Sequence, residues 1–177
     1  MKFHNTELEG AYVIQLDKYH DRRGFFARTY CQKEFQEQSL VSNIAQANTS
    51  FNKKAGTLRG MHFQAEPHQE TKLVRCTSGA IYDVIVDMRH WSATYKRWIA
   101  VELTAENGRM LYVPDHFAHG FITLKDRTEV HYLVSEVYAP EAERGLRWND
   151  PTFAIKWPRA VEVISEKDAS WPDFACE

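Results

Sequence analysis

The feature that most constrains the fold of this chain is a series of short strand-like segments separated by turn signals. Eight segments are rich in valine, isoleucine, tyrosine and phenylalanine, which are favoured on pleated surfaces; they span residues 11–17, 56–64, 72–79, 80–89, 97–104, 109–114, 119–125 and 128–138. Turn-forming residues occur at 77–79, 107–108 and 125–127. Strands at this spacing predict an all-β sandwich or barrel.

Helical patterns are confined to two short segments, residues 31–40 and 165–171. Neither resembles a helix that crosses between parallel strands, so a parallel α/β sheet is disfavoured. The 177 residues contain no internal repeat and no linker that would divide the chain. We therefore expect one all-β domain over residues 1–177, with a few short peripheral helices.

Charge and cysteine content argue against several classes of protein. The formal charge is −2, and no basic cluster offers a surface to nucleic acid. Cys31, Cys76 and Cys176 are odd in number and widely spaced, which disfavours a disulfide framework or a zinc ribbon and suits a reducing compartment. Because no stretch is apolar enough for a signal peptide or a membrane span, we expect a cytoplasmic protein with no membrane partner.

One stretch concentrates positive charge within a strand-like pattern. Residues 59–76, RGMHFQAEPHQETKLVRC, hold two arginines, two histidines and a lysine among alternating apolar residues. Charges of one sign are costly inside a core unless something compensates them. This pattern predicts an anionic ligand in the interior of the barrel.

Residues 108–123 resemble the second motif of the cupin superfamily, with His116 and Thr123 in place of its glycine and asparagine. Metal-binding cupins carry two histidines and a glutamate in the first motif, whereas this chain has His62, Gln64 and Lys72. An ammonium group repels a divalent cation and an amide is a poor ligand, so we expect no catalytic metal.

Ordered segments along most of the chain resemble one cupin branch, the dTDP-4-dehydrorhamnose 3,5-epimerase family of nucleotide-sugar epimerases. The matching segments lie at 21–30, 46–50, 57–64, 72–76, 82–89, 92–95, 101–114, 117–121, 138–151 and 165–169. The resemblance implies a cupin-type jelly-roll barrel, or double-stranded β-helix, that needs no cofactor. It also implies a homodimer whose N-terminal segments pack on the neighbour, and residues 11–17 are free to do so.

The implied substrate is a 4-keto-6-deoxy nucleotide sugar, most simply dTDP-4-dehydro-6-deoxy-D-glucose, epimerised at C3 and C5. Its ketone acidifies the neighbouring C–H bonds, so the reaction requires a base, a cation near the ketone oxygen and an acid on the opposite ring face. His62 suits the base because imidazole titrates near neutral pH. The resemblance assigns Asp168 as its carboxylate partner, and Asp83 is the alternative.

Two further catalytic roles follow from the resemblance. Lys72 and His62 would both point into the barrel, where the ammonium of Lys72 suits a developing enolate oxygen. Tyr132 matches the general acid of the family.

Substrate-binding residues are also implied. Arg59 and Arg23 match the positions that hold the diphosphate, for which the guanidinium fork is well suited. Strict strand alternation would put Arg59 and His62 on opposite faces, so a bulge at Gly60 is expected if both touch one ligand. Otherwise Arg59 would reach the ligand from a sheet edge or from a partner subunit. The remaining matched positions are Phe26 with its neighbour Phe25, Gln46, Asn48, His119, Tyr138, Glu143 and Lys167. Family members often carry an acidic residue where this chain has Arg28.

Three alternatives stay open. The protein could be a 3-epimerase or a 3,4-ketoisomerase on a related nucleotide sugar. It could be a metal-dependent cupin that uses His62, His116 and His119, or a sugar-binding barrel with no turnover.

Overall fold

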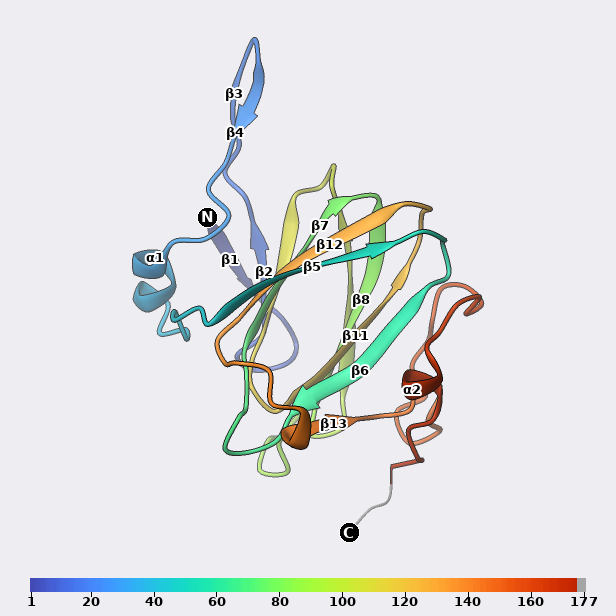
Figure 1. Cartoon of the computed structure of the whole chain (residues 1–177). Coiled ribbons are helices and arrows are strands. Elements are labelled where there is room, and N and C mark those ends of the chain that lie inside the picture. Colours follow the sequence, from blue (N-terminus) through green and yellow to red (C-terminus); the bar gives the residue numbers. More distant parts are fainter. Residues whose placement is uncertain (175–177) are drawn as a thin grey trace.

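Two antiparallel sheets face one another in the computed structural model, which describes residues 1–174 (Figure 1). In spatial order, the six-stranded sheet comprises β1 (Lys2–Asn5), β2 (Tyr12–Gln15), β10 (Arg109–Val113), β7 (Lys72–Ser78), β12 (Thr128–Val134) and β5 (Gln46–Asn52). The five-stranded sheet comprises β13 (Glu143–Gly145), β6 (Leu58–Gln64), β11 (Phe117–Thr123), β8 (Ala80–Asp87) and β9 (Trp98–Thr104). From β5 to β13 the chain changes sheet at every step except from β8 to β9, and this alternation confirms the predicted jelly-roll barrel.

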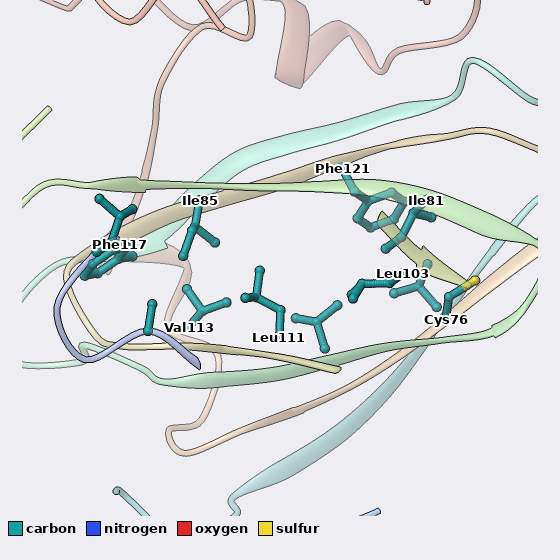
Figure 2. Packing of buried hydrophobic residues seen from close by; sticks show 12 residues of the cluster. Cys76, Ile81, Ile85, Leu103, Leu111, Val113, Phe117 and Phe121 are labelled. Carbon is teal, nitrogen blue, oxygen red and sulfur yellow. The ribbon is translucent and has the colours of Figure 1, made fainter. Parts of the chain in front are cut away.

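The core lies between the two sheets because alternate residues of each strand point inward. Figure 2 shows Leu111 and Val113 of β10 facing Ile81 and Ile85 of β8 across this space. Phe117, also in this layer, is only 2 % exposed. One end of the barrel is therefore filled with apolar side chains, and an anionic ligand must bind elsewhere between the sheets.

Both outer faces are partly covered by segments of the same chain. Phe35 of α1 (Gln32–Glu37) packs with Ile14 and Met110 on the six-stranded sheet. The C-terminal segment places Leu146 and Phe153 on the five-stranded sheet, and α2 (Glu166–Ala169) follows it. Because these segments bury the outer faces, the strands beneath them are more apolar than strict alternation predicts.

The eight predicted strands are all present, with ends that differ by a few residues, and both predicted helices are shorter than expected. The sequence pattern missed β5 because its inward side chains are polar, and it missed three-residue strands such as β13. A 3-10 turn, η1 (Pro140–Ala142), was not predicted either.

The expectation that residues 11–17 are free for a neighbouring subunit is wrong. Residues 12–15 form β2, which pairs with β1 on one side and β10 on the other. The projecting segment is the hairpin that follows, β3 (Tyr19–Asp21) and β4 (Gly24–Phe26), which extends away from the barrel in Figure 1. All six of its strand residues are exposed.

No helix within residues 1–174 is long and apolar enough to cross a membrane. Cys31 and Cys76 are free thiols, and Cys176 lies outside the described residues.

Candidate active site

Two adjoining cavities open between the sheets, on the side of β5 in one sheet and of β6 and the edge strand β13 in the other. The first has a volume of about 450 Å³ and the second about 360 Å³. His62, Lys72 and Tyr132 line both cavities. The side chains that the sequence selected for base, cation and acid therefore share one space, although they come from strands β6, β7 and β12.

His62 is held by Asp168, more than a hundred residues further along the chain. Nε2 of His62 lies 2.7 Å from Oδ1 of Asp168, and the backbone N–H of Gly60 donates to Oδ2 at 3.2 Å. Ser165 caps α2 by accepting from the Asp168 N–H, which fixes the carboxylate. Burial alone raises the pKa of Asp168, but the hydrogen bond and charge of His62 and the Gly60 amide outweigh it, so the pKa lies below its usual range.

A bulge at Gly60 brings Arg59 and His62 to the same cavity. The pairing of β6 with β11 matches His62 to His119 and then Arg59 to Phe121, so β6 carries one extra residue between them. Gly60 has φ of +108°, and a Cβ there would lie 2.6 Å from the backbone of β11. Arg59 is exposed at the cavity wall, where its Nε donates to Oδ1 of Asn52 at 2.8 Å.

Asp83, the alternative partner for His62, instead holds His119. Nε2 of His119 lies 2.7 Å from Oδ1 of Asp83, which is fully buried. Its other oxygen, Oδ2, has no hydrogen-bond partner among the described residues. Two histidine–carboxylate pairs thus lie side by side, because His62 and His119 are directly opposite on neighbouring strands.

Lys72 carries a buried counter-ion. Its Nζ donates to Oε1 of Glu70 at 2.5 Å, and the two side chains are only 10 % and 12 % exposed. Tyr132 lies at the same cavities, and burial raises the pKa of its phenol. The negative charge of Glu70 raises that pKa further, while the positive charge of Arg59 lowers it.

Polar side chains from three segments surround the second cavity. Gln46, Tyr138 and Glu143 line it together with Asn48. Oε1 of Gln46 accepts from the Tyr138 N–H at 2.9 Å, and the Tyr138 hydroxyl donates to Glu143 at 2.6 Å. Lys167 donates to the same Glu143 oxygen at 2.5 Å, and these bonds outweigh burial to lower the pKa of Glu143. Gln46, Tyr138, Glu143 and Lys167 therefore form one hydrogen-bonded group, and Asn48 lies at the same cavity.

Arg23 and Phe26 are not brought to either cavity of their own chain. Both lie on the projecting hairpin, where the Arg23 side chain is 84 % exposed and pairs with Asp21. Phe26 lines a separate hollow at the base of the hairpin. Arg28 pairs with Glu34 of α1 at 3.1 Å, away from both cavities.

Sequence reasoning missed a neighbour of Lys72 and a neighbour of His62. Glu70 lies two residues before Lys72, and this spacing in an extended chain would have indicated a shared face. Trp171 gave no such signal. Its indole ring contacts the His62 ring edge-on with centroids 6.4 Å apart, and a Cβ at Gly145 would collide with it.

The three histidines of the metal-dependent alternative do not converge. His62 and His119 each bond to a carboxylate, whereas His116 lies in a turn beside Trp91 and Glu66. Within residues 1–174, no group of three or more His, Cys, Asp or Glu side chains is arranged to hold a metal ion.

Comparison with known proteins shows the family of this chain. A family model described as dTDP-4-dehydrorhamnose 3,5-epimerase matches residues 5–175. The chain is 44 % identical over 178 residues to dTDP-4-dehydrorhamnose 3,5-epimerase of Sinorhizobium fredii, a match that covers 100 % of this chain and 91 % of the relative.

Solved structures are equally close in fold. The Bacillus anthracis dTDP-4-dehydrorhamnose 3,5-epimerase with TDP and PPi bound has a TM-score of 0.95 at 41 % identity, covering 98 % of this chain and 99 % of that one. A 3'-monoepimerase from Streptomyces bikiniensis, in complex with dTDP-quinovose, has a TM-score of 0.90 at 31 % identity, covering 96 % and 86 %. Sequence and fold agree, and the chain belongs to the dTDP-4-dehydrorhamnose 3,5-epimerase family.

Proposed function

We propose that this protein epimerises dTDP-4-dehydro-6-deoxy-D-glucose at C3 and C5, which gives dTDP-4-dehydro-L-rhamnose. The observation that carries the proposal is the shared position of His62, Lys72 and Tyr132 at both cavities. A base, a cation and an acid within one space are what proton removal and return beside a ketone require. The two adjoining cavities have room for the two halves of a nucleotide sugar.

The base is His62. Because the Asp168 carboxylate only accepts hydrogen bonds, Nε2 of His62 carries the hydrogen that joins them, and the lone pair is on Nδ1. Nδ1 takes the proton from the carbon beside the ketone, and the electron pair of that C–H bond moves onto the ketone oxygen as an enolate. Asp168 then stabilises the imidazolium.

The enolate oxygen is negative, and the ammonium of Lys72 stabilises it. Tyr132 returns a proton to the carbon from the opposite face of the ring, the enolate collapses to the ketone, and the configuration at that carbon is inverted. The phenolate and the imidazolium regain their starting protonation states by exchange with solvent before the second carbon reacts.

Residues around the cavities hold the remaining parts of the substrate. Arg59 pairs with the diphosphate as a planar guanidinium. Gln46, Asn48 and Tyr138 contact the nucleoside. His119, Glu143 and Lys167 hold the sugar and phosphates.

The proposal includes a homodimer in the cytoplasm. The hairpin that carries Arg23 and Phe26 extends away from its own cavities, and Tyr19, Phe25 and Phe26 on it are 68 %, 54 % and 69 % exposed. Exposed aromatic rings on a projecting hairpin suit contact with a second copy, whose cavity they would complete. The free thiols of Cys31 and Cys76 suit a reducing compartment.

Complementation tests the dimer. Arg23→Ala and His62→Ala variants are each expected to be inactive alone, and light scattering should give twice the monomer mass. Mixing the two after reversible dissociation should restore activity, because one mixed site carries neither change. If mixed dimers form but activity is not restored, the hairpin does not contribute to the active site of the partner subunit.

Incubation with dTDP-4-dehydro-6-deoxy-D-glucose in heavy water tests the function. Deuterium should enter both C3 and C5, and His62→Ala should abolish entry at both. Deuterium at C3 alone would indicate the second candidate, a 3-epimerase, which the likeness to the Streptomyces bikiniensis monoepimerase supports. A ketone that migrates to C3 would indicate a ketoisomerase, and no exchange at all would indicate a binding barrel.

A further inference from the structure

Each acidic side chain that lines the two cavities has a defined partner. Asp168 bonds to His62, and Glu143 bonds to Lys167 and Tyr138. The third, Glu70, bonds to Lys72 and has no role in the mechanism proposed above. A carboxylate beside the cation that should stabilise an enolate weakens that cation, so its presence needs an explanation.

The ion pair lies largely out of water. Glu70 and Lys72 side chains are 12 % and 10 % exposed, and their charged atoms are 2.5 Å apart. A buried pair costs desolvation free energy and is not by itself a source of stability. The pair does orient the Lys72 ammonium: one N–H points to Glu70, and this bond fixes the directions of the other two N–H groups.

The same carboxylate acts on Tyr132. Both residues line the second cavity, and no other partner of the Glu70 side chain is found within residues 1–174. A negative charge nearby disfavours phenolate, and Glu70 contributes to the raised pKa of Tyr132. Only the protonated phenol can donate to the enolate.

We propose that Glu70 is a positioning residue that directs the Lys72 ammonium toward the substrate ketone and opposes ionisation of the Tyr132 phenol. The two effects come from one carboxylate that bonds to the cation and lines the same cavity as the acid of the reaction. The kinetic part of this inference rests on the proposed function. The electrostatic part concerns the free protein and can be measured without substrate.

The direct test follows the ionisation of Tyr132 by fluorine NMR. Protein made with 3-fluorotyrosine, whose phenol ionises at lower pH than that of tyrosine, gives one resonance for each tyrosine. The Tyr132 resonance is identified by its loss in Tyr132→Phe. In Glu70→Gln, which keeps an acceptor oxygen for Lys72 but removes the charge, this resonance should titrate at a pH lower by about half a unit or more.

Glu141→Gln is the matched control. It removes the same charge from a side chain that is 74 % exposed and lines neither cavity, so the Tyr132 titration should stay as in the wild type. Equal titrations in wild type and Glu70→Gln would overturn the inference. An equal shift in both variants would also overturn it, because the effect would then be one of net charge.

Kinetics separate charge from position. The basic limb of the kcat/KM profile should move to lower pH in Glu70→Gln and should stay in place in Glu70→Asp, which keeps the charge. Glu70→Asp should instead lose about tenfold or more in kcat because its shorter side chain redirects Lys72. Unchanged kcat in Glu70→Asp would refute the positioning role. A wild type without turnover would instead refute the proposed function, and the NMR titration would then still decide whether Glu70 acts on Tyr132.

Discussion

Replacement of Asp168 by asparagine tests the central contact of the site. In the wild type, two donors meet the two carboxylate oxygens: His62 Nε2 at 2.7 Å and the Gly60 N–H at 3.2 Å. Asparagine has one acceptor oxygen and an NH₂ group that donates. Either the Gly60 N–H faces another donor, or His62 turns to the tautomer that places its hydrogen on Nδ1, which can then no longer accept a proton.

The expected losses in turnover and in folding stability follow from these two outcomes. Loss of a correctly oriented general base lowers turnover by ~10²–10⁴-fold, which is about 3–5 kcal/mol in activation free energy. A buried donor without a partner costs ~1–3 kcal/mol of folding stability, and Asp168 is only 5 % exposed. Because the pKa of Asp168 is lowered in the folded state, its contribution to stability is present above its unfolded pKa and is lost as pH falls through the folded value.

The assay combines deuterium exchange at C3 and C5 with urea unfolding at neutral and acidic pH. Asp168→Asn should show the full loss of exchange while remaining folded, and its stability deficit relative to wild type should shrink on acidification. Asp126→Asn, at a side chain that is 60 % exposed and pairs weakly with Lys54, serves as the control for loss of one charge. Turnover within about threefold of wild type in Asp168→Asn would refute the assignment of His62 as a base oriented by Asp168.

Three further predictions concern the scaffold. Gly60→Ala should lower the free energy of unfolding by ~2 kcal/mol or more, because the new Cβ would lie 2.6 Å from backbone atoms at a φ of +108°. Gly24→Ala is the control: its φ is +131°, but the space around it is open, so it should lose less stability in the same denaturation assay. Burial raises the pKa of Asp87, but hydrogen bonds from an arginine, a serine and a threonine lower it to about 2. The wild type should therefore be more stable than Asp87→Asn by ~2 kcal/mol above pH 3.8. Acid titrations followed by circular dichroism should show this advantage vanish as pH falls through about 2. Burial raises the pKa of Cys76 to about 11, so mass spectrometry after alkylation near pH 8 should find Cys31 modified and Cys76 unmodified, and rapid labelling of Cys76 in folded protein would contradict this.

Much of the fold could be predicted because strand patterns are local. Runs of apolar residues mark β8 and β10, and the structure has both strands close to the predicted ends. The same rule failed for β5, whose inward side chains are polar because they line a cavity instead of the core. A strand that serves a binding site loses the pattern by which strands are recognised.

Local sequence patterns predicted eight of the strands, and the resemblance predicted the family together with the roles of His62, Lys72 and Tyr132. The inward direction of His62 and Lys72 could be expected because side-chain direction along a strand has a period of two residues. The fold chooses Asp168 over Asp83 as the partner of His62. It also pairs Asp83 with His119 and Glu70 with Lys72, and the sequence predicted neither of these contacts. The fold also directs the hairpin of Arg23 away from its own cavities. These contacts depend on strand pairing and on the packing of a distant helix, and neither of them produces a pattern at fixed spacing in the sequence.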